Sequence, residues 1–67
     1  MFIKLKLNKD TDFYVNLDHV DSIVHYLDKR EIDVKYNDKI ADYYYSKEQV
    51  PYNEFVLKEI VKNGNVW

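Results

Sequence analysis

The chain has no cysteine and only one glycine and one proline among its 67 residues. Without cysteine, neither a disulfide framework nor a thiolate metal site can form. The single glycine, Gly64, cannot build a glycine-rich phosphate loop. No apolar run has the length of a signal peptide or a membrane span, because Lys4 and Lys6 interrupt the first one. These absences predict a cytoplasmic protein that is not inserted in a membrane.

An excess of positive charge is also missing. Ten lysine and arginine residues stand against twelve aspartate and glutamate residues, which gives a net charge of -2. A protein that depends on phosphate contacts normally has a basic excess. Lys4 and Lys6 can form a local basic patch, but lysine is equally typical of the solvent side of an edge strand. Nucleic acid is therefore not the expected partner, and a nucleic-acid-binding small β-barrel is kept as the alternative hypothesis.

No catalytic or metal-binding pattern is complete. Residues 8–12 begin like a calcium loop, but Phe13 stands where glycine is required and His19 where a bidentate glutamate should be. His19, Asp21 and His25 do not have the spacing of a zinc ligand set, and we expect these histidines to be exposed to solvent. The sequence therefore predicts no cofactor, no metal site and no catalytic residue, and the protein is not expected to be an enzyme.

The apolar fraction of 46% and the aromatic fraction of 16% predict a folded globule. In residues 31–36 apolar and charged side chains alternate, which indicates a half-buried strand. Asn37-Asp38 tolerates positive φ and can form a tight turn to a second strand, 39–45. The expected strands are 2–7, 13–16, 22–27, 31–36 and 39–45. We predict one α+β domain, residues 1–67, formed by a five-stranded antiparallel β-meander curled toward a small barrel, with one C-terminal α-helix.

An apolar stripe at helical spacing predicts a helix over residues 51–62, followed by a tail, 63–67. Ser46 and Gln49 have the spacing of a capping box, but Pro51 would interrupt a helix that began there. Two interpretations remain, a short capped turn over residues 46–50 followed by a helix from Pro51, or a single kinked element. The first is favoured, because proline is well tolerated at the first helical position.

The chain contains seven tyrosines. Tyrosine is enriched in protein interfaces, because it joins a large apolar ring to a polar tip. We therefore predict a candidate interaction surface formed by Tyr43, Tyr44, Tyr45 and Trp67. The expected function is that of a small, non-enzymatic interaction or accessory protein, whose partner is another protein or a second copy of itself in a homo-oligomer.

Several short motifs follow one another along the chain. They are Leu7-Asn8, Phe13-Tyr14-Val15-Asn16, Leu17-Asp18-His19-Val20-Asp21-Ser22-Ile23, Ile32-Asp33-Val34, Asn37-Asp38 and Tyr43-Tyr44-Tyr45-Ser46. In order and spacing, residues 1–61 resemble the FlbD-like family of small bacterial flagellar and swarming-motility proteins. Lys9 and Asp38 stand where that family usually has glycine, and Leu17 replaces a turn proline. The resemblance implies a small bacterial accessory protein, related to motility and without catalytic residues. A related fold from a phage, with no connection to flagella, would show the same pattern of core residues.

Overall fold

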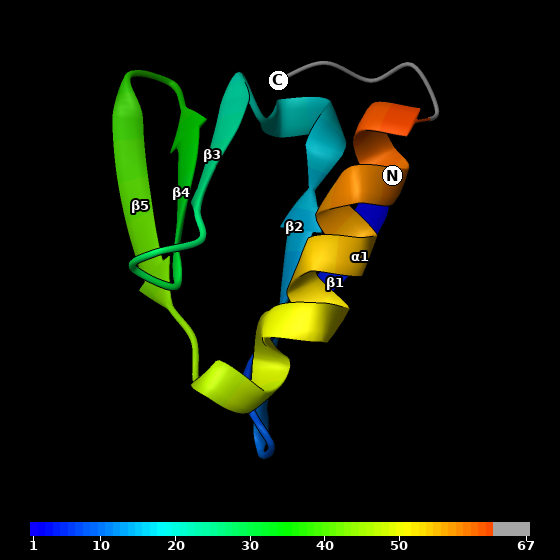
Figure 1. The fold of residues 1–67 in the computed structure, drawn as a ribbon. Helices are drawn as coiled ribbons and strands as arrows, with labels where there is room; N and C mark the ends of the chain where they lie inside the picture. Colours follow the sequence, from blue (N-terminus) through cyan, green and yellow to red (C-terminus); the bar gives the residue numbers. More distant parts are fainter. Residues whose placement is uncertain (63–67) are drawn as a thin grey trace.

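The structure is a computed structural model that describes residues 1–62 (Figure 1). It is an α+β arrangement with antiparallel strands and one C-terminal helix, and within the described residues no helix has the length and apolar character needed to cross a membrane. The elements in chain order are β1 (Phe2–Asn8), β2 (Thr11–Asn16), the 3-10 helix η1 (Leu17–His19), β3 (Ser22–Tyr26), β4 (Glu31–Tyr36), β5 (Lys39–Tyr44), the 3-10 helix η2 (Lys47–Gln49) and α1 (Val50–Lys62). The predicted tail, residues 63–67, lies outside the described residues.

The predicted five-stranded meander curled toward a barrel is wrong. The strands form two separate antiparallel sheets, a β1-β2 hairpin and a three-stranded sheet in the order β3-β4-β5. Figure 1 shows these sheets as two arms that diverge at one end, with α1 beside the hairpin. Within residues 1–62 the strands therefore do not close into a barrel.

The break between the sheets lies at η1. Leu17 is buried, and its backbone N–H donates to the carbonyl of Met1, so the chain turns as soon as β2 ends. The Asn16 side chain caps this turn by accepting a hydrogen bond from the Asp18 N–H. Asp21 then donates its N–H to the carbonyl of Lys35, which joins the start of β3 to β4. The chain thus leaves β2 before β3 can pair with it.

The β4-β5 hairpin has the turn that the sequence predicts. Asn37 and Asp38 both have positive φ, 48° and 63°, as the two central residues of a type I′ turn require. This two-residue turn sets the register, in which Tyr36 lies opposite Lys39 and Glu31 lies opposite Tyr44. Which side chains share a face of the sheet follows directly from this register.

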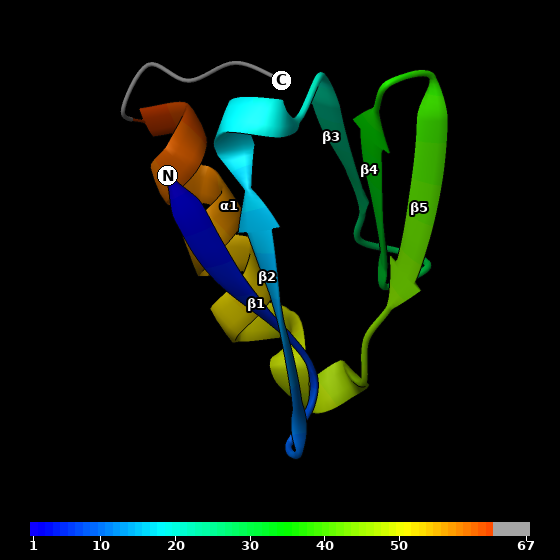
Figure 2. The same ribbon diagram turned by 180° about the vertical axis from the view of Figure 1, so that it is seen from behind.

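The core lies between the inner faces of the two sheets and α1. Phe13 of β2 stacks on Tyr43 of β5 with their ring centroids 4.2 Å apart, so the sheets meet face to face. Figure 2 shows α1 running along the hairpin behind β1, with β2 on the side of the three-stranded sheet. The buried apolar residues come from both sheets, from η1, from the end of β5 and from α1: Leu5, Val15, Leu17, Ile32, Val34, Tyr45 and Ile60.

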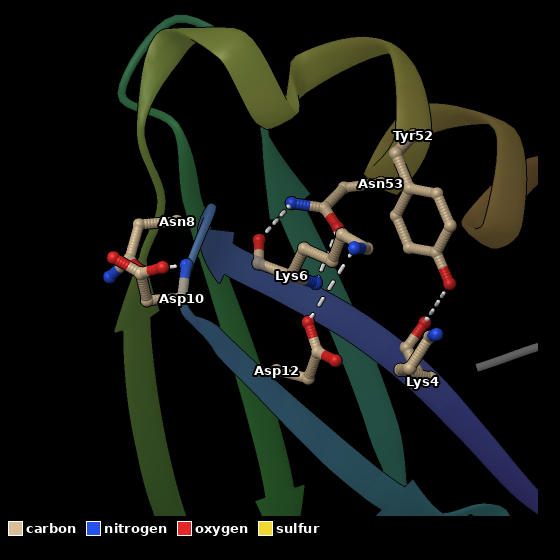
Figure 3. Close-up of polar contacts among 7 residues, drawn as sticks. All are labelled: Lys4, Lys6, Asn8, Asp10, Asp12, Tyr52 and Asn53. Carbon is tan, nitrogen blue, oxygen red and sulfur yellow. Dashed lines mark hydrogen bonds and ion pairs between the residues drawn. The ribbon is translucent and has the colours of Figure 1, made fainter.

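Side chains of α1 cover the free edge of β1 (Figure 3). The side-chain amide of Asn53 accepts a hydrogen bond from the N–H of Lys6 at 2.9 Å and donates one to the carbonyl of Lys6 at 2.8 Å. Tyr52 donates its hydroxyl to the carbonyl of Lys4 at 3.0 Å. Asn53 therefore gives the backbone N–H and carbonyl of Lys6 the hydrogen bonds that a neighbouring strand would give them. The Asn53 side chain is fully buried.

The segment before α1 resembles the first of the two interpretations given above. The 3-10 turn η2 precedes the helix, which begins at Val50, one residue before Pro51. Proline is tolerated in this first turn because the N–H groups there have no intrahelical partner. Ser46 makes no side-chain capping bond, so the predicted capping box does not form.

Candidate interaction surface

The outer face of the three-stranded sheet is the most distinctive surface of the molecule. The strand register arranges its nine side chains in three cross-strand rows. The rows are Ser22, Lys35 and Ile40, then Val24, Asp33 and Asp42, and last Tyr26, Glu31 and Tyr44. We call these nine residues the acidic sheet face.

No described element covers the acidic sheet face. Within residues 1–62, α1 makes its main contacts with β1 and η2, and Figures 1 and 2 show the hairpin and α1 on the other side of this sheet. Ile40 and Tyr44 are 63% and 62% exposed, and Val24 and Tyr26 are also exposed. Four large apolar or aromatic side chains are therefore open to solvent around the acidic centre.

Three carboxylates lie together at this centre. Glu31, Asp33 and Asp42 each have a carboxylate oxygen within 4.8 Å of the other two. Glu31 is only 9% exposed, since its two cross-strand neighbours are the tyrosines Tyr26 and Tyr44. One carboxylate oxygen of Asp33, Oδ1, is enclosed and has no hydrogen-bond partner. Negative charge is thus concentrated in a group of three carboxylates that runs from the buried Glu31 through the partly buried Asp33 to the exposed Asp42.

The titration of these groups reflects their proximity. A hydrogen bond to Glu31, and then partial burial, raise the pKa of Asp33 above its usual value. Partial burial, and then the neighbouring Asp33, raise the pKa of Asp42. The negative charge of Glu31 raises the pKa of the Tyr44 hydroxyl. Each shift favours the form with less negative charge, so a cation brought to this face is stabilised.

We expect the substitution Asp33→Asn to stabilise the fold at neutral pH. The folded state of the wild-type protein binds a proton at Asp33 more tightly than the unfolded chain does, so its stability falls as pH rises from the ordinary aspartate pKa through the raised one. Asparagine keeps the shape, adds no charge and has an N–H that can donate to the Glu31 carboxylate, which an ionised aspartate lacks. Urea denaturation should give a higher midpoint for the variant at pH 7 and no gain at about pH 3, below both pKa values.

The matched control for this prediction is Asp10→Asn, because Asp10 is exposed in the β1-β2 turn, away from the carboxylates. Its urea midpoint should stay close to that of the wild-type protein at both pH values. A gain for Asp33→Asn that is equally large at pH 3, or no gain at pH 7, would contradict the assignment of repulsion to this cluster.

The same three carboxylates are the one group of possible metal ligands found within residues 1–62. Carboxylate oxygens suit hard cations such as Ca²⁺ and Mg²⁺, which take six or more ligands. Three carboxylates provide only part of such a shell, and water would have to supply the rest. The arrangement can attract and hold positive charge, including that of a lysine or arginine side chain.

His25 does not face solvent as expected. It lies half-buried on the inner face of β3, and its Nε2 is 2.6 Å from the hydroxyl oxygen of Tyr45. Partial burial lowers the pKa of His25, whereas the nearby Glu54 raises it to a smaller extent. His19 is exposed in η1. The structure thus assigns His25 to the interior, where it is paired with a tyrosine.

The residues predicted as an interaction surface do not form one patch. Tyr43 points to the inner face and stacks on Phe13. Tyr44 belongs to the acidic sheet face. Tyr45 is 4% exposed and belongs to the core, because the chain leaves the sheet there and turns toward α1. Trp67 lies outside the described residues. Of these four residues, Tyr44 is the one that offers its ring to a partner in the described structure.

A second surface lies on the outer face of the β1-β2 hairpin. The register places Phe2 opposite Asn16, Lys4 opposite Tyr14 and Lys6 opposite Asp12. The Nζ atom of Lys6 lies 3.8 Å from a carboxylate oxygen of Asp12 and 5.6 Å from the centre of the Tyr52 ring (Figure 3). Phe2 and Tyr14 are exposed. We call these six residues the basic hairpin face.

A small open pocket lies where the two sheets diverge. Its volume is about 210 Å³, and three tyrosines from different strands line it: Tyr14, Tyr36 and Tyr43. The other lining residues are Val15, Asn16, His19, Val20 and Val34. A cavity of roughly 150 Å³ accommodates benzene, so this pocket can take one aromatic ring.

The chain was compared with families of known proteins, with curated proteins and with solved structures. No family model, no curated protein and no solved structure matches it. Membership of the FlbD-like family therefore stays a prediction from the motifs, and function must be argued from the surfaces described above.

Proposed function

We propose that this protein is a non-enzymatic protein-binding module whose acidic sheet face binds a positively charged, partly apolar surface of another protein molecule. The observation that carries the proposal is the position of three crowded carboxylates, Glu31, Asp33 and Asp42, at the centre of an uncovered sheet face. The exposed side chains of Val24, Tyr26, Ile40 and Tyr44 surround this centre.

This layout has the elements of a binding interface. Aromatic side chains are enriched in protein interfaces and supply much of their binding energy. Complementary charge speeds association and selects the partner. A lysine or arginine at the centre would offset the repulsion among the carboxylates and give Asp33 Oδ1 a hydrogen-bond donor. A negatively charged partner would increase that repulsion.

Nucleic acid is disfavoured by the same charges. The acidic sheet face repels phosphates, and the basic hairpin face has only Lys4 and Lys6 to offer. Lys6 lies 3.8 Å from Asp12, which reduces its net contribution. Two lysines can neutralise about two phosphates, fewer than the six to ten contacts of strongly salt-dependent DNA binders.

The proposal can be tested with the isotope-labelled protein and a synthetic peptide of alternating lysine and tyrosine. Titration followed by NMR should shift the backbone amide signals of Val24, Asp33 and Asp42, with little change at Leu5 in the core. The shifts should shrink when salt is added, because salt screens exposed charges. The double variant Asp33→Asn, Asp42→Asn should bind the peptide more weakly by about tenfold.

Two controls make the peptide experiment specific. A matched peptide with glutamate in place of lysine should leave the same amide signals unchanged. The double variant Lys47→Gln, Glu48→Gln, in η2, should bind the lysine peptide as the wild-type protein does. Equal shifts with both peptides, or lysine-peptide shifts confined to other surfaces, would show that the acidic sheet face is not the binding site.

A further inference from the structure

The basic hairpin face repeats the layout of the acidic sheet face with the opposite charge. At its centre lie Lys4 and Lys6, with one carboxylate, Asp12. Two exposed aromatic residues, Phe2 and Tyr14, flank the lysines. On the acidic sheet face three carboxylates and one lysine, Lys35, are flanked by exposed apolar and aromatic residues. One chain therefore displays both halves of a complementary pair.

We infer that the partner of the acidic sheet face is a second copy of this chain, which docks through its basic hairpin face. This inference rests on the proposed function and identifies its ligand. Lys4 of one copy would lie over the carboxylates of the next, with Phe2 and Tyr14 against the exposed tyrosines Tyr26 and Tyr44. Charge and apolar character match in both parts of the contact.

The contact must join different faces of the two copies. If two acidic sheet faces met, their six central carboxylates would repel one another. The two faces also point away from each other within one copy, because both inner faces meet in the core through the Phe13 and Tyr43 rings. Each copy can therefore use both faces at once, and such head-to-tail contacts build rings or open chains.

The association is expected to be weak. Three strands about 4.8 Å apart and six residues of about 3.3 Å each span a face of roughly 300 Å². A stable specific interface buries about 800 Å² on each partner. Light scattering should therefore extend from micromolar to millimolar protein, where the mean mass should rise above the 8.2 kDa of one chain. Added salt should shift this rise to higher concentration.

Charge reversal of either face tests the inference directly. Lys4→Glu reverses one of the two central positive charges of the basic hairpin face, and Asp42→Lys reverses one of the three central negative charges of the acidic sheet face. Lys4 and Asp42 are suitable because neither side chain has an ion pair in the described structure, as Lys6 and Asp12 do. Each variant alone should weaken self-association by about tenfold or more. An equimolar mixture of the two should recover the association, since each supplies the face that the other lacks.

Reversals of adjacent charges in η2, Lys47→Glu and Glu48→Lys, serve as controls and should associate like the wild-type protein. A wild-type protein that stays monomeric at millimolar concentration would overturn the inference. So would an equimolar mixture of Lys4→Glu and Asp42→Lys that stays monomeric, if each variant alone is also monomeric. Loss of oligonucleotide binding in Lys4→Glu with no change in mass would also overturn it, by assigning that face to nucleic acid. The lysine-tyrosine peptide separates the proposed function from the inference of self-association. If the peptide binds the acidic sheet face of a protein that stays monomeric, the proposed function holds and the self-association does not.

Discussion

Replacement of Asn53 by alanine should destabilise the protein by about 2–3 kcal/mol, because it leaves two backbone groups of β1 without partners. In the wild-type protein the side-chain amide of Asn53 bonds to both the N–H and the carbonyl of Lys6. A domain of this length has a total stability of roughly 3–10 kcal/mol. Urea denaturation of Asn53→Ala should therefore show a large fall of the midpoint, without a change of fold class in circular dichroism.

Two further variants separate the edge contact from the helix itself. Phe55 lies on the exposed side of α1. The variant Phe55→Ala should therefore change the free energy of unfolding by less than about 0.5 kcal/mol. Asn53→Asp keeps an acceptor for the Lys6 N–H but loses the donor to the carbonyl, so most of the loss should remain. If Asn53→Ala were no less stable than Phe55→Ala, the edge of β1 would not depend on this side chain.

Adjacent tyrosines should respond to alanine in opposite ways. Tyr45→Ala should cost about 3–5 kcal/mol, as truncation of a large buried aromatic side chain does. Its ring is 4% exposed, and its hydroxyl is bound to His25. Tyr44→Ala should change stability by only about 0.5 kcal/mol, because the Tyr44 ring is exposed on the acidic sheet face. Denaturation curves of the two variants under identical conditions test this difference.

Tyr45→Phe isolates the hydroxyl of Tyr45 from its ring. It should cost about 1 kcal/mol, since it removes the hydrogen bond to His25 and keeps the packing. In the binding experiments, Tyr44→Ala should weaken peptide binding, whereas Tyr45→Phe should leave it unchanged. Similar stability losses for Tyr44→Ala and Tyr45→Ala would contradict the separation of these rings between surface and core.

Local patterns predict much of this fold, because they depend on near neighbours. The alternation in residues 31–36 predicts β4, and the positive φ of Asn37 and Asp38 agrees with the predicted turn. The sequence analysis did not predict the acidic centre, although the strand register implies it. A two-residue turn after Tyr36 fixes the pairing of Asp33 with Asp42, and the same register sets Glu31 in the next row of the face.

The arrangement of the two sheets could not be derived in this way. Strand patterns from 2–7 to 39–45 are compatible with one meander, and nothing local shows that Leu17 is buried and turns the chain away from β2. The burial of Tyr45 could not be derived from the sequence for a related reason. Its place in a run of three tyrosines suggests a strand surface, but β5 ends at Tyr44 and the next ring enters the core.

The role of Asn53 was missed because an asparagine within a helix has no pattern of its own. Its bonding partner is Lys6, 47 positions earlier in the chain. Polar residues in a helix usually face solvent, and sequence spacing does not show that this one meets an unpaired strand edge.

The separation of 47 positions between Asn53 and Lys6 also has a consequence during protein synthesis. β1 leaves the ribosome before α1, and at a synthesis rate of roughly 5–20 residues per second the delay is several seconds. During that interval the nascent β1-β2 hairpin has an open edge, to which other nascent chains can add strands. Translation pauses before Asn53 should therefore increase aggregation of this protein, and chaperone binding to the hairpin should reduce it.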